Sequence, residues 1–318
     1  MPLNEDVPDY VKDVWQRQDT EYFDLWLQES LEWDRAGFYD RYAGLLNPRD
    51  GELIIDVGAG NGTLLSYLYE RSDKAHYIAV ERSRYAALFA FKMLEKFLPL
   101  TGYLSGRLQW TSQHRPRWVY EVPPRKQLQE IKKSLSDRIL ILTDDIRYPT
   151  VLPAVLGRER ADALSLSMPG GPSVRALEWP FDCPEEQLEE SEVERRVKHV
   201  SDDTRKATFH FAAKHLKDGG RLLIAERVAT ASDPSPENML GSFGASIGPY
   251  RKYWSAQNLF FSGPVDVQSG LQWIPTKHEK KETEGSPGIP EKPVRRAAIL
   301  TLIRNKRRFR ESPLPRPS

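Results

Sequence analysis

The sequence predicts an α/β fold with a doubly wound, mostly parallel sheet. Short apolar segments alternate with amphipathic segments along most of the chain, which is the pattern of strands joined by helices. A glycine-rich turn follows the first apolar segment and directly precedes a helical pattern. Strands joined by helices in this way pair in parallel through right-handed crossovers, so we expect helices on both faces of the sheet.

The N-terminal part of the chain predicts helices and then the first strand. Apolar residues recur at helical spacing through residues 8–45, which indicates two amphipathic helices. Residues 53–56 (LIID) are a short buried-strand signal that ends at Gly58, and residues 63–70 return to a helical pattern. Further downstream we expect helices over 85–98 and 203–217, and strands over 75–80, 138–143, 161–167, 221–228 and 297–303.

Three stretches interrupt the alternation. Residues 98–137 are far longer than an ordinary connection of about two to six residues, and they mix aromatic residues with seven Lys or Arg and three Asp or Glu. Residues 178–196 are acidic, and residues 276–293 predict a mobile loop. We therefore expect an N-terminal helical segment or lid (1–45), a domain with these insertions (46–303), and a basic, Pro-rich tail (304–318).

Composition narrows the classes of protein. Hydrophobic residues make up 39% of the 318 residues, enough for a packed core, and no apolar run is long enough to span a membrane. Cys183 is the only cysteine, which excludes an internal disulfide and fits a reducing compartment. The net charge of +1 argues against general coating of nucleic acid. The histidines show no metal-site spacing, so we expect no metal. We predict a cytoplasmic protein, with a nuclear location as the alternative if the basic tail is an import signal.

The glycine turn carries the main functional signal. In IIDVGAGNGTLL (54–65) the glycines permit a tight turn and let backbone N–H groups approach a ligand. A dinucleotide fingerprint requires a third small residue at position 63, where this chain has Thr63. The loop instead has the form D-x-G-x-G-x-G, beginning at Asp56.

This loop resembles the first motif of the class I S-adenosyl-L-methionine-dependent methyltransferases. Residues 81, 143–149, 161–169 and 215–226 are similar to later motifs of that family, and the resemblance covers roughly 38–97 and 138–228. It implies the seven-stranded, Rossmann-like class I methyltransferase sheet and S-adenosyl-L-methionine as cofactor. Glu81 would hold the ribose hydroxyls, and Asp144 or Asp145 would meet the adenine amino group. The cofactor residues implied in this way are Asp56, Gly58, Ala59, Gly60, Asn61, Gly62, Glu81, Arg82, Asp144, Asp145 and Ser167.

The sequence says less about which residues would contact the methyl acceptor. The fourth motif leads into SMPGGP (167–172), which lacks the Asn/Asp-Pro-Pro-aromatic motif of enzymes that methylate nucleic-acid amines. Met168 and Pro169 are candidates for substrate contact, with a simple Gly/Pro-rich turn as the alternative. His199 is either part of an acceptor site or a plain surface histidine. No catalytic base is identified.

Three functions follow from these observations. The first is a methyltransferase acting on a small molecule, which we favour slightly. The second is a methyltransferase acting on RNA or protein, or binding an acidic partner, through the basic residues of 98–137 and 304–310. The third is a methyltransferase-like scaffold without activity. In the family, N-terminal helices often cover the cofactor, so Trp15, Trp26 and Trp33 either form a lid or pack on the domain.

Overall fold

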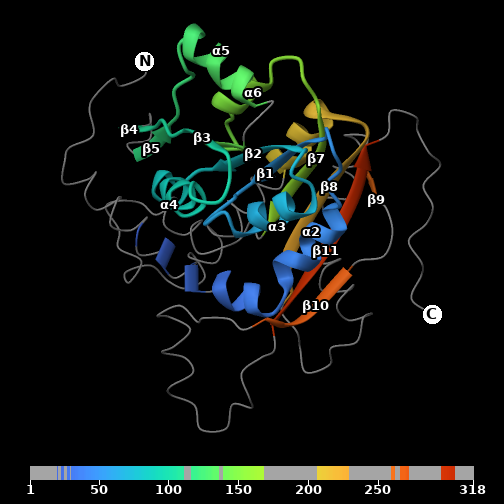
Figure 1. Cartoon of the computed structure of the whole chain (residues 1–318). Helices are drawn as coiled ribbons and strands as arrows, with labels where there is room; N and C mark the ends of the chain where they lie inside the picture. Colours follow the sequence, from blue (N-terminus) through green and yellow to red (C-terminus); the bar gives the residue numbers. More distant parts are fainter. Residues whose placement is uncertain are drawn as a thin grey trace.

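A computed structural model describes residues 20, 23–24, 27–28, 30–110, 116–135, 139–167, 206–228, 259–261, 266–271 and 295–304. Its main sheet has the strand order β10-β11-β8-β7-β1-β2-β6-β3, and β9 pairs with β11 (Figure 1). In the stretch of this order from β8 to β3, each strand pairs in parallel with its neighbour. β11 runs antiparallel to β8, β9 and β10. The predicted doubly wound, mostly parallel sheet is therefore confirmed.

The central strands form where the apolar segments predict them. They are β1 (Leu53–Val57), β2 (His76–Glu81), β6 (Ile139–Thr143) and β7 (Ala161–Ser167). Every residue of β1 and β6 is buried, because helices cover both faces of the sheet. Asp56 is the only ionisable side chain within β1, so an acid lies in the middle of an otherwise apolar strand.

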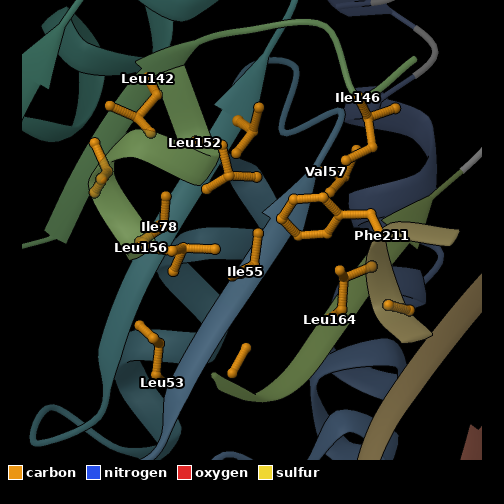
Figure 2. Packing of buried hydrophobic residues seen from close by; sticks show 14 of the residues in the cluster. Leu53, Ile55, Val57, Ile78, Leu142, Ile146, Leu152, Leu156, Leu164 and Phe211 are labelled. Atoms are coloured by element: carbon orange, nitrogen blue, oxygen red, sulfur yellow. The ribbon is translucent and has the colours of Figure 1, made fainter. Parts of the chain in front are cut away.

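Helices lie on both faces of the sheet. One face carries α2 (Phe38–Leu46), α3 (Thr63–Arg71) and α4 (Arg84–Leu94). The other carries α5 (Arg125–Ser134), α6 (Val151–Leu156) and a helical stretch over 206–215. Figure 2 shows the second core, in which Leu152 and Leu156 of α6 and Phe211 approach the strand residues Ile55 and Val57.

The stretch 98–137 contains its own secondary structure. β3 (Leu100–Tyr103) adds a parallel strand to the sheet edge beside β6, and β4 (Arg107–Trp110) pairs with β5 (Pro116–Val119) as a separate antiparallel pair. Helix α5 then returns the chain to β6. None of these four elements, nor α6, was predicted from the sequence; β3, β4 and β5 are each only four residues long.

The C-terminal part of the sheet extends beyond the predicted strands. β8 (Leu216–Val228) is longer than the expected 221–228. Its pairing with β7 jumps from Leu216 to Arg221, so the residues between them, which include Gly219 and Gly220, form an irregularity in the strand. β9 (Leu259–Phe261) and β10 (Asp266–Leu271) were not predicted. β11 (Arg295–Arg304) includes Arg304, which is buried and therefore belongs to the sheet instead of the expected tail.

The segment before β1 belongs to the core. Trp33, Phe38 and Tyr42 are buried together, so the expected boundary at residue 45 crosses α2. Two contacts between residues far apart in sequence hold α2, and the loop between α2 and β1, against β8. The Tyr42 hydroxyl donates to the backbone oxygen of Leu223 at 3.0 Å, and the Arg221 guanidinium forms an ion pair with Glu52.

Candidate functional site

The glycine loop turns at the carboxyl end of β1, at the centre of the sheet. Gly58, Gly60 and Gly62 all have positive φ, between 55° and 78°, which glycine adopts without steric cost. A Cβ at Gly62 would come within 2.7 Å of a Leu94 methyl group, so this glycine lets α3 pack against α4. A Cβ at Gly58 would meet no described atom within 4 Å, so its backbone is accessible to a ligand.

Asp56 lies beneath this loop in a buried network of hydroxyl groups. Its exposed fraction is 2%, and one carboxylate oxygen, Oδ1, is buried with no hydrogen-bond partner among the described residues. Its side chain hydrogen-bonds Ser165, the residue beside it on β7. The Ser165 hydroxyl donates to the Tyr42 hydroxyl at 3.2 Å, which in turn donates to Leu223.

Two opposing effects act on the Asp56 carboxyl group. The hydrogen bond with Ser165 lowers the pKa of Asp56, because it favours the ionised carboxylate, but burial outweighs it. Burial, with a smaller contribution from Glu81, raises the pKa of Asp56 to about 7. A cation placed at the unpartnered oxygen would reverse this effect and favour the ionised carboxylate.

Glu81, the last residue of β2, contacts the glycine loop directly. Its carboxylate accepts a hydrogen bond from the Gly60 backbone N–H at 2.8 Å and another from the Ser83 backbone N–H at 2.8 Å. These two bonds fix the carboxylate at the carboxyl edge of the sheet, beside the loop. Glu81 therefore contacts the first motif through its side chain, and its role toward the ribose stays a prediction.

Asp144 and Asp145 follow β6 and have different partners. Both oxygens of Asp144 accept backbone N–H groups at the start of α6, from Thr150 and Leu152, at 2.8–3.1 Å. Burial raises the pKa of Asp144. Burial would also raise the pKa of Asp145, but the Arg147 guanidinium, at 2.7 Å, outweighs it and holds that pKa below its usual value.

The N-terminal segment contacts both the glycine loop and α4. Ser30 hydrogen-bonds Asn61 of the glycine loop, with the Asn61 amide donating at 3.1 Å. The Phe23 ring is buried against Tyr85 and Phe89 of α4, with centroid distances of 5.3 and 5.0 Å. Trp33 is a core residue at 2% exposure, and Trp15 and Trp26 lie outside the described residues.

The remaining predicted site residues divide into two groups. Ala59 and Arg82 lie with the glycine loop and the end of β2, and Ser167 ends β7, the strand next to β1 at the same edge. Met168, Pro169 and His199 lie outside the described residues, as do 178–196, 276–293 and 305–310. Within the described ranges, no group of three or more His, Cys, Asp or Glu side chains could hold a metal ion, and no helix is long and apolar enough to cross a bilayer.

Sequence reasoning missed the partners of the predicted acids. Tyr42, Ser165 and Thr150 contact Asp56 or Asp144 directly or through one hydroxyl, but they carry no motif signal. The aromatic residues of 98–137, including Tyr120, have two interpretations from sequence: they stack on RNA bases, or they pack on the domain. The Tyr120 side chain is 5% exposed and belongs to the core, so for this residue the packing interpretation holds and it cannot stack on a base.

The strand order, the antiparallel β11 between β8 and β10, and the glycine loop after β1 define the class I methyltransferase fold, as the sequence predicts. Seven strands, from β10 to β6, make up the expected sheet, and β3 and β9 are additions.

Neither a family model nor a curated protein matches the sequence. Similar solved structures include a protein from Bacillus halodurans C-125 proposed to be a methyltransferase, at 10% identity and a TM-score of 0.46, covering 84% of this chain and 99% of that one. A SAM-dependent O-methyltransferase from Thermotoga maritima has 14% identity and a TM-score of 0.37, over 85% and 66% of the two chains. A geranyl diphosphate C-methyltransferase from Streptomyces coelicolor A3(2) has 9% identity and a TM-score of 0.39, over 83% and 78%. Similarity at this level identifies no substrate.

Proposed function

We propose that this protein is an S-adenosyl-L-methionine-dependent methyltransferase. The observation that carries the proposal is the buried Asp56 oxygen that has no hydrogen-bond partner among the described residues, two positions before the accessible backbone of Gly58. A buried carboxylate is stable only with a proton or a cationic partner, and the cofactor has an ammonium group and a sulfonium. When bound, the cofactor supplies an activated methyl group.

The other site residues would hold the adenosine half. Glu81 would accept hydrogen bonds from the ribose hydroxyls, because a carboxylate can accept two bonds from a vicinal diol. We assign the adenine contact to Asp145. Both oxygens of Asp144 accept backbone N–H groups at the start of α6. Asp145 accepts one backbone N–H, that of Arg147, and its other partner is the Arg147 side chain, which can rearrange. The catalytic role of the chain is then to bind and align, since an in-line methyl transfer needs no nucleophile from the protein.

The acceptor is a separate part of the proposal. A small molecule is slightly favoured, because residues 167–172 lack the motif for nucleic-acid amines. An inactive scaffold is disfavoured, because the glycine loop, Asp56 and Glu81 are all in place. A cytoplasmic location stays a prediction.

The second candidate, an RNA acceptor, is favoured by one observation. Four cations of α5 are exposed on the surface: Arg125, Lys126, Lys132 and Lys133. The pairs 125/132 and 126/133 are each two helical turns apart and share one face. Such a face suits a phosphate backbone.

Calorimetric titration of S-adenosyl-L-methionine and S-adenosyl-L-homocysteine into the full-length protein tests the cofactor. We expect micromolar binding that is lost in Asp56→Ala and Glu81→Ala. Folded protein that binds neither ligand at millimolar concentration contradicts the proposal and favours the scaffold.

A labelled-methyl screen of extracts, separated into RNA, protein and small-molecule fractions, then identifies the acceptor class. For RNA, the double variant Arg125→Glu/Lys126→Glu should abolish salt-sensitive binding. Lys92→Glu/Lys96→Glu, in the last turn of α4 and just beyond its end, serves as the charge-matched control.

A further inference from the structure

The inserted stretch between α4 and β6 meets the proposed cofactor site at one residue, Tyr120. The Tyr120 hydroxyl donates a hydrogen bond to the backbone oxygen of Arg82 at 2.5 Å. The backbone oxygen of Tyr120 accepts a hydrogen bond from the Thr150 hydroxyl at 3.1 Å. The residue therefore joins the turn after β2 to the turn after β6, which are the two turns that carry Glu81, Asp144 and Asp145.

The surroundings of Tyr120 are those of the site and not of the protein surface. Burial raises the pKa of Tyr120 well above its ordinary value, and the charges of Asp145, Arg82, Glu81 and Asp144 all act on the phenol. The hydroxyl therefore keeps its proton and remains a donor at every physiological pH. Its ring packs in the same core as the apolar residues of β2 and β6.

The hydrogen bond to Arg82 acts on the position of Glu81. Glu81 contacts the backbone N–H of Gly60 on one side and of Ser83 on the other. Arg82 is the residue between Glu81 and Ser83, and its carbonyl is the group that Tyr120 holds. Releasing that carbonyl would free the turn on which the Glu81 carboxylate is presented.

We propose that Tyr120 is a positioning residue for the adenosine half of the cofactor, and that the insertion is a structural part of the cofactor site. The proposal rests on the proposed function, because it assigns Tyr120 to the same site. It makes the stretch 98–137 necessary for cofactor binding whatever the acceptor is.

The variant Tyr120→Phe tests this, because it removes one oxygen and keeps the ring. Tyr103→Phe is the matched control: the Tyr103 hydroxyl also donates to a backbone oxygen within the insertion, that of Glu121 at 2.9 Å, but this bond lies in an exposed region. The ligands are S-adenosyl-L-homocysteine and 5′-methylthioadenosine, which carries the adenosine half without the amino-acid half. Circular dichroism establishes that each variant is folded.

We expect Tyr120→Phe to weaken both ligands by a similar factor, about fivefold to tenfold, as for the loss of one buried hydrogen bond. Tyr103→Phe should bind both as the wild type does. Wild-type protein that binds neither ligand refutes the proposed function itself. Wild-type binding with an unchanged Tyr120→Phe variant, or with equal losses in both variants, overturns only the role of Tyr120.

A double-mutant cycle with Glu81→Gln distinguishes positioning of Glu81 by Tyr120 from a general destabilisation of the site. If Tyr120 acts through Glu81, the double variant Tyr120→Phe/Glu81→Gln should bind S-adenosyl-L-homocysteine no more weakly than Glu81→Gln alone. Fully additive losses would show that Tyr120 acts independently of Glu81 and would overturn the positioning role.

Discussion

The variant Asp56→Asn tests the buried network under the glycine loop. Asparagine has nearly the same shape as aspartate but cannot ionise, so it keeps the packing and removes the charge. The described surroundings of Asp56 offer Ser165 and, through it, Tyr42, but no cation on either carboxylate oxygen. We therefore expect the variant to stabilise the ligand-free protein at alkaline pH and to weaken cofactor binding.

The expected change in the free energy of unfolding follows from the pKa of Asp56. An acid whose pKa rises on folding holds its proton more tightly in the folded state. Its contribution to stability is therefore complete below the unfolded pKa and is lost as the pH rises through the folded pKa. With a pKa of 3.8 in the unfolded chain and about 7 in the folded protein, Asp56 alone lowers the free energy of unfolding by about 2.5 kcal/mol between pH 5 and pH 8.

Urea unfolding of the wild type and of Asp56→Asn at both pH values measures this quantity. Other ionisable groups are common to both proteins, so the difference between their free energies of unfolding should shift by about 2.5 kcal/mol in favour of the variant from pH 5 to pH 8. Asp73→Asn, at an exposed carboxylate, is the control and should track the wild type. A parallel pH dependence in wild type and Asp56→Asn would refute the reasoning, because it would mean that Asp56 titrates as an exposed acid does.

Three further outcomes are expected. Gly62→Ala should lower the free energy of unfolding by about 1–3 kcal/mol in denaturant titrations, because it combines a positive φ with a contact to Leu94; an unchanged midpoint contradicts this. Asp144→Ala should lower the melting temperature, because it removes the buried carboxylate that accepts the N–H groups at the start of α6. Asp145→Ala should mainly reduce cofactor affinity in calorimetry. The reverse pattern would exchange the roles of the two acids. Burial lowers the pKa of His215 to about 4, so its contribution to stability is lost as the pH falls from about 6.5 through 4. His215→Gln should therefore make the free energy of unfolding less sensitive to acid in that pH range. An unchanged dependence of stability on pH between about 6.5 and 4 would contradict this.

The central part of the fold was predictable from sequence because its signals are local. β6 is an apolar run that ends in Thr143, β1 is apolar except for Asp56, and α3 starts directly after the glycines. β3 and β10 (LTGY and DVQSGL) contain glycine and little apolar repetition. They are strands because β6 and β11 supply a partner edge, and a neighbouring strand is not visible in a local sequence pattern.

Some residues of the candidate site were likewise predictable from the sequence, and others were not. The glycine loop and Glu81 were predictable because they occupy successive strand ends of a parallel sheet, which the topology brings together. Tyr120 and Arg82 are 38 residues apart, and no spacing rule predicts which residue of an irregular insertion will contact the turn after β2. Spacing likewise left Asp144 and Asp145 equivalent, whereas the helix that starts at Val151 distinguishes them through its backbone N–H groups.

The bond between Tyr42 and Leu223 has a consequence for how the protein is made. The two residues are separated by 181 positions, and the Arg221–Glu52 pair spans 169. At a synthesis rate of about 5–20 residues per second, the ribosome needs about 10–35 s to progress from one end of the Tyr42 contact to the other. For much of that interval β1 and the glycine loop have been synthesised, but β7, whose Ser165 lies beside Asp56, and β8 have not. The nascent chain must therefore keep an apolar strand with an embedded acid in solution until its C-terminal half emerges, which makes this protein a candidate for chaperone dependence during translation.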